Sequence, residues 1–197
     1  MNRADVHDTL RERLRGDDLD WIVPDWDVPS NVAAFMTTRN GGAGREGAFD
    51  VGGADMPVER ARIVAAHRRH IEAYLPARPH WLTQIHGADV VEIDADPPGR
   101  APRADAAVTR RANVVLTVRV ADCMPVLFAT HDGGVVGIAH AGWRGLANGV
   151  LERTLQSMRC DARDVCAWLG PAIGASAFEV GPDVYEAFVA PDEGARA

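Results

Sequence analysis

Cysteine is scarce in this 197-residue sequence, which contains only three. A small and odd number of thiols does not make a disulfide framework. No two cysteines form the Cys-x-x-Cys pair that is typical of zinc ribbons and of the common zinc deaminase signature. We therefore expect reduced thiols, and any metal site must be assembled from residues that lie far apart in the sequence.

Long apolar runs and an excess of basic residues are also missing. No stretch approaches the roughly 18 apolar residues of a membrane span, and the first 20 residues contain no apolar core of signal-peptide length. Lysine and arginine total 21 against 28 aspartates and glutamates, so the net charge is -7, and the basic residues are scattered. This pattern predicts a soluble, cytoplasmic protein without a membrane or nucleic-acid partner.

The remaining composition is that of an ordinary globular protein, with 47% hydrophobic and 25% charged residues. The length fits one domain better than two. In residues 1–20, charged groups of both signs surround isolated apolar positions, so we expect a solvated N-terminal arm or helix there. We assign residues 21–197 to a single domain.

Two kinds of hydrophobic spacing run through the chain. Helical spacing predicts amphipathic helices over residues 58–75, 145–158 and 182–190. On the first of these, His67 and His70 lie three residues apart beside Arg68 and Arg69, and we expect both imidazoles to be solvated. Short segments rich in β-branched residues and bounded by Gly, Pro or Asp predict strands over 31–38, 80–87, 88–94, 105–109, 113–123, 125–130, 134–142, 164–170 and 176–180. Strands outnumber helices and cluster centrally, which favours an α+β architecture with helices covering mixed sheets.

Three of the predicted strands end in the same way, with a metal-binding residue type beside a Gly or Pro turn. The segments are QIHG, ADCMP and AHAGWRG, and the residues are His86, Cys123 and His140. Two imidazoles and a thiolate suit zinc and leave the fourth tetrahedral position open, as a catalytic site requires. Each residue also has an ordinary interpretation, a small buried thiol or a hydrogen-bonded histidine. Spacing alone therefore leaves both interpretations open.

Four further side chains are candidates for catalysis or substrate binding. Gln84 precedes His86 by two residues and would face the same side of an extended strand. Asp122 would point away from Cys123, so it either orients a ligand or forms the turn before the next strand. Two arginines, Arg144 at the start of a helix and Arg39 after the first predicted strand, could clamp phosphate or carboxylate, with surface salt bridges as the alternative.

The combination of several segments makes the sequence similar to a known family. From about Trp26 to Phe188 it resembles the YfiH family, also called laccase-domain or purine nucleoside phosphorylase YfiH-like proteins, whose bacterial members include a peptidoglycan editing factor. The resemblance is carried by TTRNGG, QIHGADVV, ADAAVT, VADCMPVLFA, GIAHAGWRGL and LGPAIGASAFEVGPDVYEAF. Together these motifs are highly specific.

The resemblance implies a four-layer α/β/β/α sandwich of mixed sheets and a zinc ion bound by His86, Cys123 and His140. It implies phosphorolysis of adenosine, inosine and methylthioadenosine to the free base and a ribose phosphate, and deamination of adenosine. The expected partners are thus a purine nucleoside and phosphate, with zinc expected over copper. For some bacterial members it also implies a link to quality control of peptidoglycan precursors.

The sequence departs from the family pattern at two places. Residues 49–52 read Phe-Asp-Val-Gly where the family usually has Leu-Asn-Leu-Gly, so Asp50 stands in place of an asparagine. The chain stops at Ala197, where the family normally continues through another helix and further strands. We therefore expect a domain that is shortened at its C-terminus.

Three other functions compete for the same residues. Cys123 could be the nucleophile of a hydrolase acting on a peptidoglycan precursor, with His86 or His140 as its base. A copper polyphenol oxidase would need more histidines in one site than the seven of this chain can supply. A binding module with a structural zinc would close the fourth coordination position.

Overall fold

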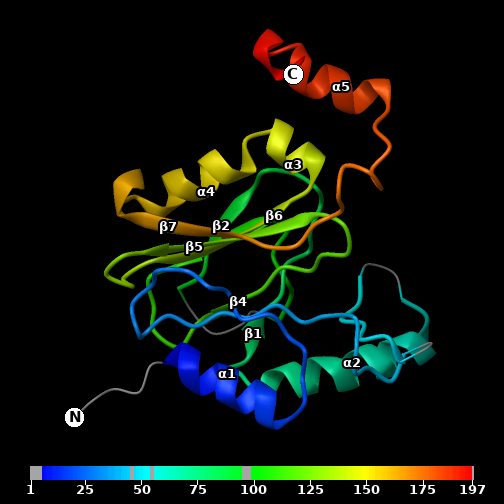
Figure 1. Ribbon diagram of the computed structural model, residues 1–197, viewed down its shortest axis with the longest axis vertical. Coiled ribbons are helices and arrows are strands. Elements are labelled where there is room, and N and C mark those ends of the chain that lie inside the picture. The colour runs from blue at the N-terminus through cyan, green and yellow to red at the C-terminus, as the bar shows by residue number, and fades with distance from the viewer. Residues whose placement is uncertain (1–5, 45–46, 54–55, 95–98, 197) are drawn as a thin grey trace.

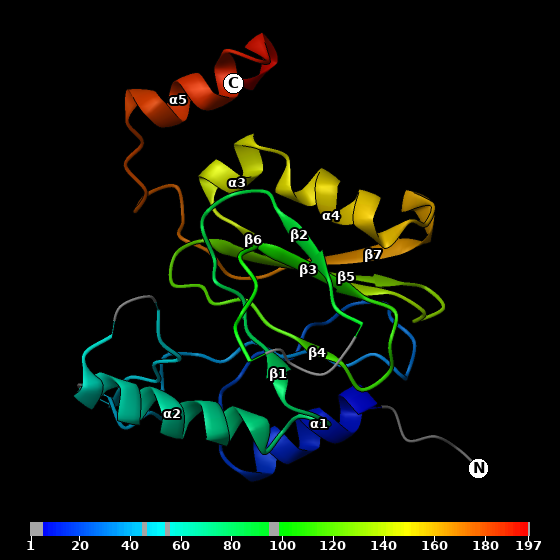
Figure 2. The ribbon, with the colours of Figure 1, turned by 180° about the vertical axis from the view of Figure 1, so that it is seen from behind.

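The computed structural model describes residues 6–44, 47–53, 56–94 and 99–196. In Figure 1, two β-sheets lie one above the other, with helices covering the outer face of each sheet. Figure 2 shows the same four layers from behind. This arrangement confirms the predicted fold class, a single mixed domain in which two sheets lie between helices.

The larger sheet has five strands in the order β2-β3-β6-β5-β7. β2 and β3 are parallel, and the other neighbouring pairs are antiparallel. The three central strands are mostly buried because both faces of the sheet are covered. The strands are β2 (Val90–Glu92), β3 (Ala106–Thr109), β6 (Val136–Ala141), β5 (Met124–Thr130) and β7 (Val165–Leu169).

Alternate residues of the larger sheet enter two different hydrophobic clusters. Ala106 and Val108 of β3 pack toward the helical layer with Val150, and all three are fully buried. Ala107, between them in sequence, packs on the opposite face with Ile138 of β6. Successive side chains of a strand point to opposite faces, so this one sheet contributes to the core on both sides.

The smaller sheet is much shorter than the sequence predicts. It consists of β1 (Pro79–His80) and β4 (Val115–Leu116), which run parallel. The predicted strands over 80–87 and 113–123 therefore shrink to two residues each. Beyond these residues, side-chain hydrogen bonds connect the two segments. Thr117 Oγ1, for example, donates to the carbonyl oxygen of His80 at 2.6 Å.

Helices α3 (Trp143–Ala147) and α4 (Val150–Met158) cover the larger sheet. The sequence predicts one continuous helix here, and the structure has two. The break lies at Gly149, whose φ of +77° is a left-handed conformation that glycine adopts without steric cost. Within the described residues, no helix is long and apolar enough to cross a lipid bilayer.

Helices α1 (Val6–Gly16) and α2 (Val58–Glu72) form the opposite outer layer. The sequence predicts a solvated arm or helix in residues 1–20, and the helix that forms is solvated on one face only. Leu10 and Leu14 are buried in a cluster with Trp21 and Ile71. These contacts tie the N-terminal helix to α2.

Two of the predicted strands are wrong. Residues 31–38 make only one isolated bridge, between Met36 and Ile22. Phe35 in this segment stacks on Trp21 at 5.2 Å, so aromatic packing holds the segment where strand pairing was expected. Residues 176–180 begin inside a turn, in which the carbonyl oxygen of Gly174 accepts the N–H groups of Ala177 and Phe178.

The C-terminal part of the chain extends away from the layered body. After β7 comes a loop, then α5 (Pro182–Val189) and the short 3-10 helix η3 (Glu193–Arg196). Figure 1 shows α5 above α3, away from both sheets. Another 3-10 turn, η2 (Ala162–Asp164), connects α4 to β7.

Candidate metal centre

Three side chains from distant parts of the chain come together at one end of the larger sheet. One donor atom each of His86, Cys123 and His140 lies within 4.8 Å of the others. His86 is exposed, Cys123 is half-buried and His140 is buried. The structure thus brings together the three ligand candidates of the sequence.

The strand register explains why two of these residues meet. His140 belongs to β6 and lies opposite Pro125 of β5, while Cys123 immediately precedes β5. His86 comes from the loop that leads into β2. A group of this composition within the described residues can hold one metal ion.

Asp105 fixes the orientation of His140. Its Oδ1 atom lies 2.8 Å from His140 Nδ1, and the Asp105 side chain is fully buried. A carboxylate at this distance favours a proton on Nδ1, which leaves Nε2 with a lone pair for a metal. The donor chemistry therefore fits a divalent transition-metal ion.

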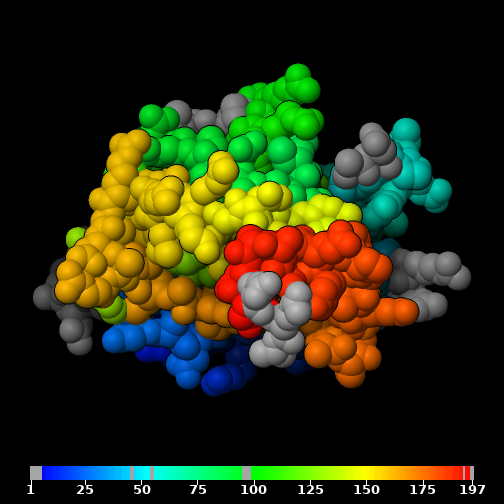
Figure 3. Space-filling view, turned by 90° about the horizontal axis from the view of Figure 1, so that it is seen from above, coloured from blue at the N-terminus to red at the C-terminus, as the bar shows by residue number. Residues whose placement is uncertain are grey.

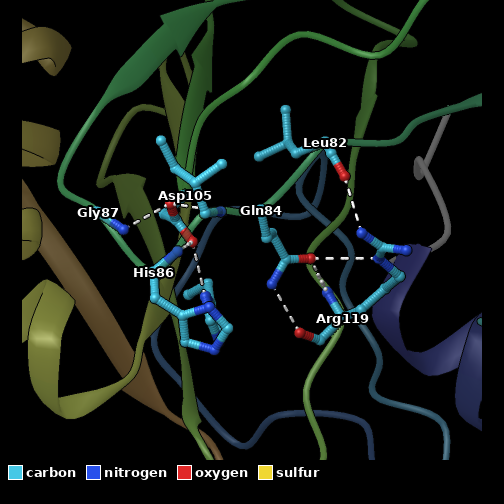
Figure 4. Close-up of polar contacts among 8 residues, drawn as sticks. Leu82, Gln84, His86, Gly87, Asp105 and Arg119 are labelled. Atoms are coloured by element: carbon cyan, nitrogen blue, oxygen red, sulfur yellow. Dashed lines mark hydrogen bonds and ion pairs between the residues drawn. The ribbon is translucent and has the colours of Figure 1, made fainter. Parts of the chain in front are cut away.

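The same carboxylate holds the loop that carries His86. It accepts the backbone N–H groups of Ile85 at 3.0 Å, His86 at 2.9 Å and Gly87 at 2.8 Å. His86 has a φ of +58°, a conformation that costs a non-glycine residue about 1–3 kcal/mol. Figure 4 shows the contacts of Asp105 with this loop. One buried aspartate thus positions two of the three ligand candidates.

The hydrogen bonds of Asp105 also determine its charge. Burial by itself would raise the pKa of this carboxyl group, but the bonds from His140 and from the backbone of Gly87, Ile85 and His86 outweigh burial. Together they hold the pKa below its usual value. Asp105 is therefore ionised at neutral pH and accepts all four hydrogen bonds as a carboxylate.

Two glycines of the AHAGWRG motif let the ligand segments approach each other. A Cβ atom at Gly142 would lie 2.8 Å from Cys123 Sγ, a distance that real Cβ contacts essentially never show. A Cβ atom at Gly145 would lie 3.1 Å from the carbonyl oxygen of Gly87. Both glycines are thus explained by close packing around the cluster.

Cys123 and Asp122 lie beside each other with different roles. Burial raises the pKa of the Cys123 thiol, and the charges of Asp122 and Asp105 raise it further. The Asp122 side chain is exposed, while its carbonyl oxygen accepts the N–H of Ile173 at 2.9 Å. Asp122 therefore tethers the C-terminal loop to the ligand segment through its backbone.

The side chain of Gln84 connects two of the ligand-bearing segments. Its Nε2 donates to the carbonyl oxygen of Arg119, and its Oε1 accepts from the N–H of Arg119, both at 2.8 Å. The Arg119 guanidinium in turn donates to the carbonyl oxygen of Leu82 at 3.0 Å. Figure 4 shows this set of bonds on the side of Gln84 away from Asp105. Gln84 thus fixes the segment of His86 to the segment of Cys123.

The two arginines proposed as anion clamps are both exposed. Arg144 lies in α3, immediately after the His140 strand, and its guanidinium stacks over the Trp143 ring at 4.1 Å. Arg39 forms no salt bridge within the described residues, and its carbonyl oxygen accepts the N–H of Phe49 at 2.6 Å. Among the described residues neither guanidinium forms an ion pair, and the role of both arginines as anion clamps stays a prediction.

The histidine pair of α2 differs from the sequence expectation. His67 is buried, not solvated, and its Nε2 accepts the N–H of Ala43 at 2.8 Å. Its Nδ1 lies 2.8 Å from the carbonyl oxygen of Asp50, and its ring stacks on Phe49. His67 therefore anchors the chain at Ala43 and at Asp50 to α2.

Sequence reasoning missed Asp105 as a site residue. The sequence does contain one indication, because Asp105 directly precedes the apolar residues of the segment ADAAVT. An acidic residue is unusual at the start of a fully buried strand. What Asp105 contacts could not be read from that signal, because its partners lie 18 to 35 residues away in the sequence.

Comparison with known proteins identifies the family of this chain. The family described as multi-copper polyphenol oxidoreductase laccase matches residues 33–197. A Pseudomonas aeruginosa protein named purine nucleoside phosphorylase is 46% identical over 177 residues, covering 89% of this chain and 72% of the relative. The Escherichia coli protein named purine nucleoside phosphorylase YfiH is 44% identical over 189 residues, covering 89% of this chain and 73% of the relative.

Solved structures show the same fold. A crystal structure of a Neisseria meningitidis protein superposes with a TM-score of 0.80 at 39% sequence identity, covering 89% of this chain and 72% of that one. The YfiH protein of Bacillus licheniformis superposes with a TM-score of 0.68 at 27% identity, covering 79% of this chain and 64% of that one. The resemblance found in the sequence is thus confirmed, and the chain belongs to the laccase-like YfiH family.

Proposed function

We propose that this chain is a zinc-dependent purine nucleoside phosphorylase that acts on adenosine, inosine and methylthioadenosine and also deaminates adenosine. The observation that carries the proposal is the convergence of His86, Cys123 and His140, with donor atoms within 4.8 Å of one another. The names of the relatives support a purine nucleoside and phosphate as substrates.

The donor set and the chemistry both favour zinc. Two imidazoles and a thiolate are ligands that zinc accepts, and group transfer to phosphate needs no change of oxidation state. When bound, zinc would supply Lewis acidity toward an oxygen of the substrate. Multicopper oxidation is less suited to this chain, because the described residues contain a single His/Cys cluster of metal-binding geometry.

The residues around the cluster have separate tasks in this proposal. Asp105 orients the imidazole of His140 by its 2.8 Å contact and holds the backbone of His86, so both ligand segments are positioned before substrate arrives. Arg144 and Arg39 are the candidates to bind phosphate. A phosphate oxygen forms a bond to the anomeric carbon of the ribose while the carbon–nitrogen bond to the base breaks. The electron pair of that bond passes to the base nitrogen, which takes a proton from the phosphate or from water.

The rival hydrolase has less support from the surroundings of Cys123. A nucleophilic cysteine needs its thiolate form, and burial together with Asp122 and Asp105 raises the pKa of this thiol. The contact between Asp105 and His140 does not separate the two hypotheses, because it leaves a lone pair on His140 Nε2 that could act as a base or bind a metal. In a metal-bound protein, Cys123 would be a thiolate ligand whose proton has passed to solvent, and its sulfur would not be available as a nucleophile.

The test combines metal analysis with product analysis. Purified protein is expected to contain one zinc ion per chain, and to convert adenosine to adenine with phosphate and to inosine without it. Both products are read by chromatography. Cys123→Ser should lose zinc and both activities, whereas Cys160→Ser, a half-buried thiol outside the cluster, should keep them.

Two outcomes would contradict the proposal. The first is zinc-loaded protein that forms neither product. The second is metal-free protein that hydrolyses a peptidoglycan precursor and is inactivated when Cys123 is alkylated, because that result would establish the hydrolase.

A further inference from the structure

A groove at the edge of the larger sheet lies outside the metal cluster. It has a volume of about 640 Å³ and lies where the segment of β2 meets α4. Three arginines line it, Arg103, Arg153 and Arg159, together with the acidic residues Asp89 and Glu92. In Figure 3, α4 (yellow) lies beside the green segment that contains β2. Its volume falls within the range of small-molecule sites.

The charges of the groove are only partly compensated by one another. Glu92 forms an ion pair with Arg159 at 3.4 Å and another with Arg110 outside the groove. Arg103 and Arg153 are exposed and form no ion pair within the described part of the chain. Among the residues that the structure describes, no carboxylate pairs with these two guanidinium groups, although the whole chain has a net charge of -7.

The C-terminal end of α4 does not use these two arginines either. Helix carbonyl groups at that end attract cations, and here Arg110 fills this role, donating to the carbonyl oxygens of Met158 at 2.7 Å and Ser157 at 3.1 Å. The guanidinium groups of Arg103 and Arg153 therefore remain available to a ligand in the groove.

The rest of the lining indicates which anion fits. Gln156 and Ser157 can donate and accept hydrogen bonds, and Asp89 can accept them from hydroxyl groups. Among the described residues of the lining, only Ala88 and Val90 are apolar, and none has an aromatic ring on which a base could stack. Arginine matches phosphate with paired N–H donors. We propose that this groove binds a sugar phosphate, with Arg103 and Arg153 on the phosphate and the other polar groups on the sugar hydroxyls.

Titration calorimetry at low ionic strength tests this site with ribose 5-phosphate, ribose and inorganic phosphate as probes. Ribose 5-phosphate should bind more tightly than inorganic phosphate, and ribose should not bind measurably. The double variant Arg103→Gln/Arg153→Gln should weaken the binding of ribose 5-phosphate at least tenfold. Arg69→Gln, which removes an exposed arginine of α2 in the opposite helical layer, should leave it unchanged.

A second comparison separates this groove from the metal centre. The variant Cys123→Ser should bind ribose 5-phosphate as the wild-type protein does, whether or not the proposed enzymatic activity exists. Loss of binding in that variant would place the phosphate at the metal cluster and overturn the proposal. Equal binding by wild type and the double arginine variant would also overturn it, as would binding of inorganic phosphate as tight as that of the sugar phosphate.

Discussion

Asp105 and His140 form a buried pair, with Oδ1 of the carboxylate 2.8 Å from Nδ1 of the imidazole. The same carboxylate accepts three consecutive backbone N–H groups of the His86 loop. Because these contacts join two ligand-bearing segments that are distant in sequence, a change at Asp105 should affect the cluster more than a change at any exposed neighbour.

Replacing Asp105 with asparagine should weaken metal binding about 10–100-fold, the usual effect of removing a partner that orients a metal-ligating histidine. Asparagine keeps the size of the side chain but removes its charge. The measurement is competition for zinc with a chromophoric chelator. Asp122→Asn is the matched control, because that side chain is exposed, and it should bind zinc as the wild type does. A folded Asp105→Asn protein with unchanged zinc affinity would refute this role.

Gly142→Ala should displace Cys123 and lower zinc affinity without a backbone penalty. The φ and ψ angles of Gly142, -71° and 161°, are accessible to alanine, so only the 2.8 Å approach of the new Cβ to Cys123 Sγ opposes the change. Gly16→Ala, where nothing lies within 4 Å of a new Cβ, is the control for the loss of a glycine. Zinc content after dialysis distinguishes the two. If both variants retain equal zinc, the packing explanation is wrong.

Removing the ring of His67 should destabilise the protein by about 2 kcal/mol, since a buried side chain and its bonds to two backbone groups are lost. His67→Ala leaves the N–H of Ala43 and the carbonyl oxygen of Asp50 without their present partner. Urea unfolding gives the free energy of unfolding. Arg69→Ala, on the exposed side of the same helix, should change it by less than about 0.5 kcal/mol. A similar effect of both changes would contradict an anchoring role.

Asp50 should make the free energy of unfolding of the protein depend on pH in the acidic range. A hydrogen bond from Arg60 is the main cause that lowers the pKa of Asp50, and the backbone N–H of Gly52 adds to it, while burial acts in the opposite direction. The pKa of Asp50 in the folded protein thus lies below the value of about 3.9 for an unfolded chain. The stabilisation that ionised Asp50 provides is therefore complete above a pH of about 3.9. It is lost as the pH falls through the lowered folded-state value.

The comparison that checks this effect is between wild type and Asp50→Asn. The variant should be less stable at neutral pH, and the difference should disappear as the pH falls below about 4. Denaturant unfolding at a series of pH values measures the difference directly. A difference that stays constant over this range would show that Arg60 and Asp50 do not interact as a charged pair.

The sequence predicts the centre of this fold better than its periphery. The buried strands β3, β5 and β6 are continuous apolar segments, and such segments have few alternatives to a covered sheet. The regions around β1 and β4 have the same β-branched composition but pair over two residues only. Their remaining residues are held by side-chain contacts, which hydrophobic periodicity does not record.

The same limit applies to the candidate site. His86, Cys123 and His140 could be selected because each has a metal-binding side chain at the end of an apolar segment. Asp105 acts through a hydrogen bond to His140, and Gln84 acts through Arg119. Roles that depend on a partner elsewhere in the chain follow from the tertiary structure, so residue type and spacing do not predict them.

The pairing of β5 with β6 has a consequence far from the cluster. Cys123 and His140 lie at the open end of this hairpin, and residues 131–135 close its other end, with Gly133 at a φ of +68°. A slip of one residue exchanges the two faces of a strand, so a β5–β6 pairing shifted by one position would turn His140 away from Cys123. Whether the two ligand candidates can meet therefore depends on a register that runs the whole length of the hairpin to a turn at the far end of the sheet.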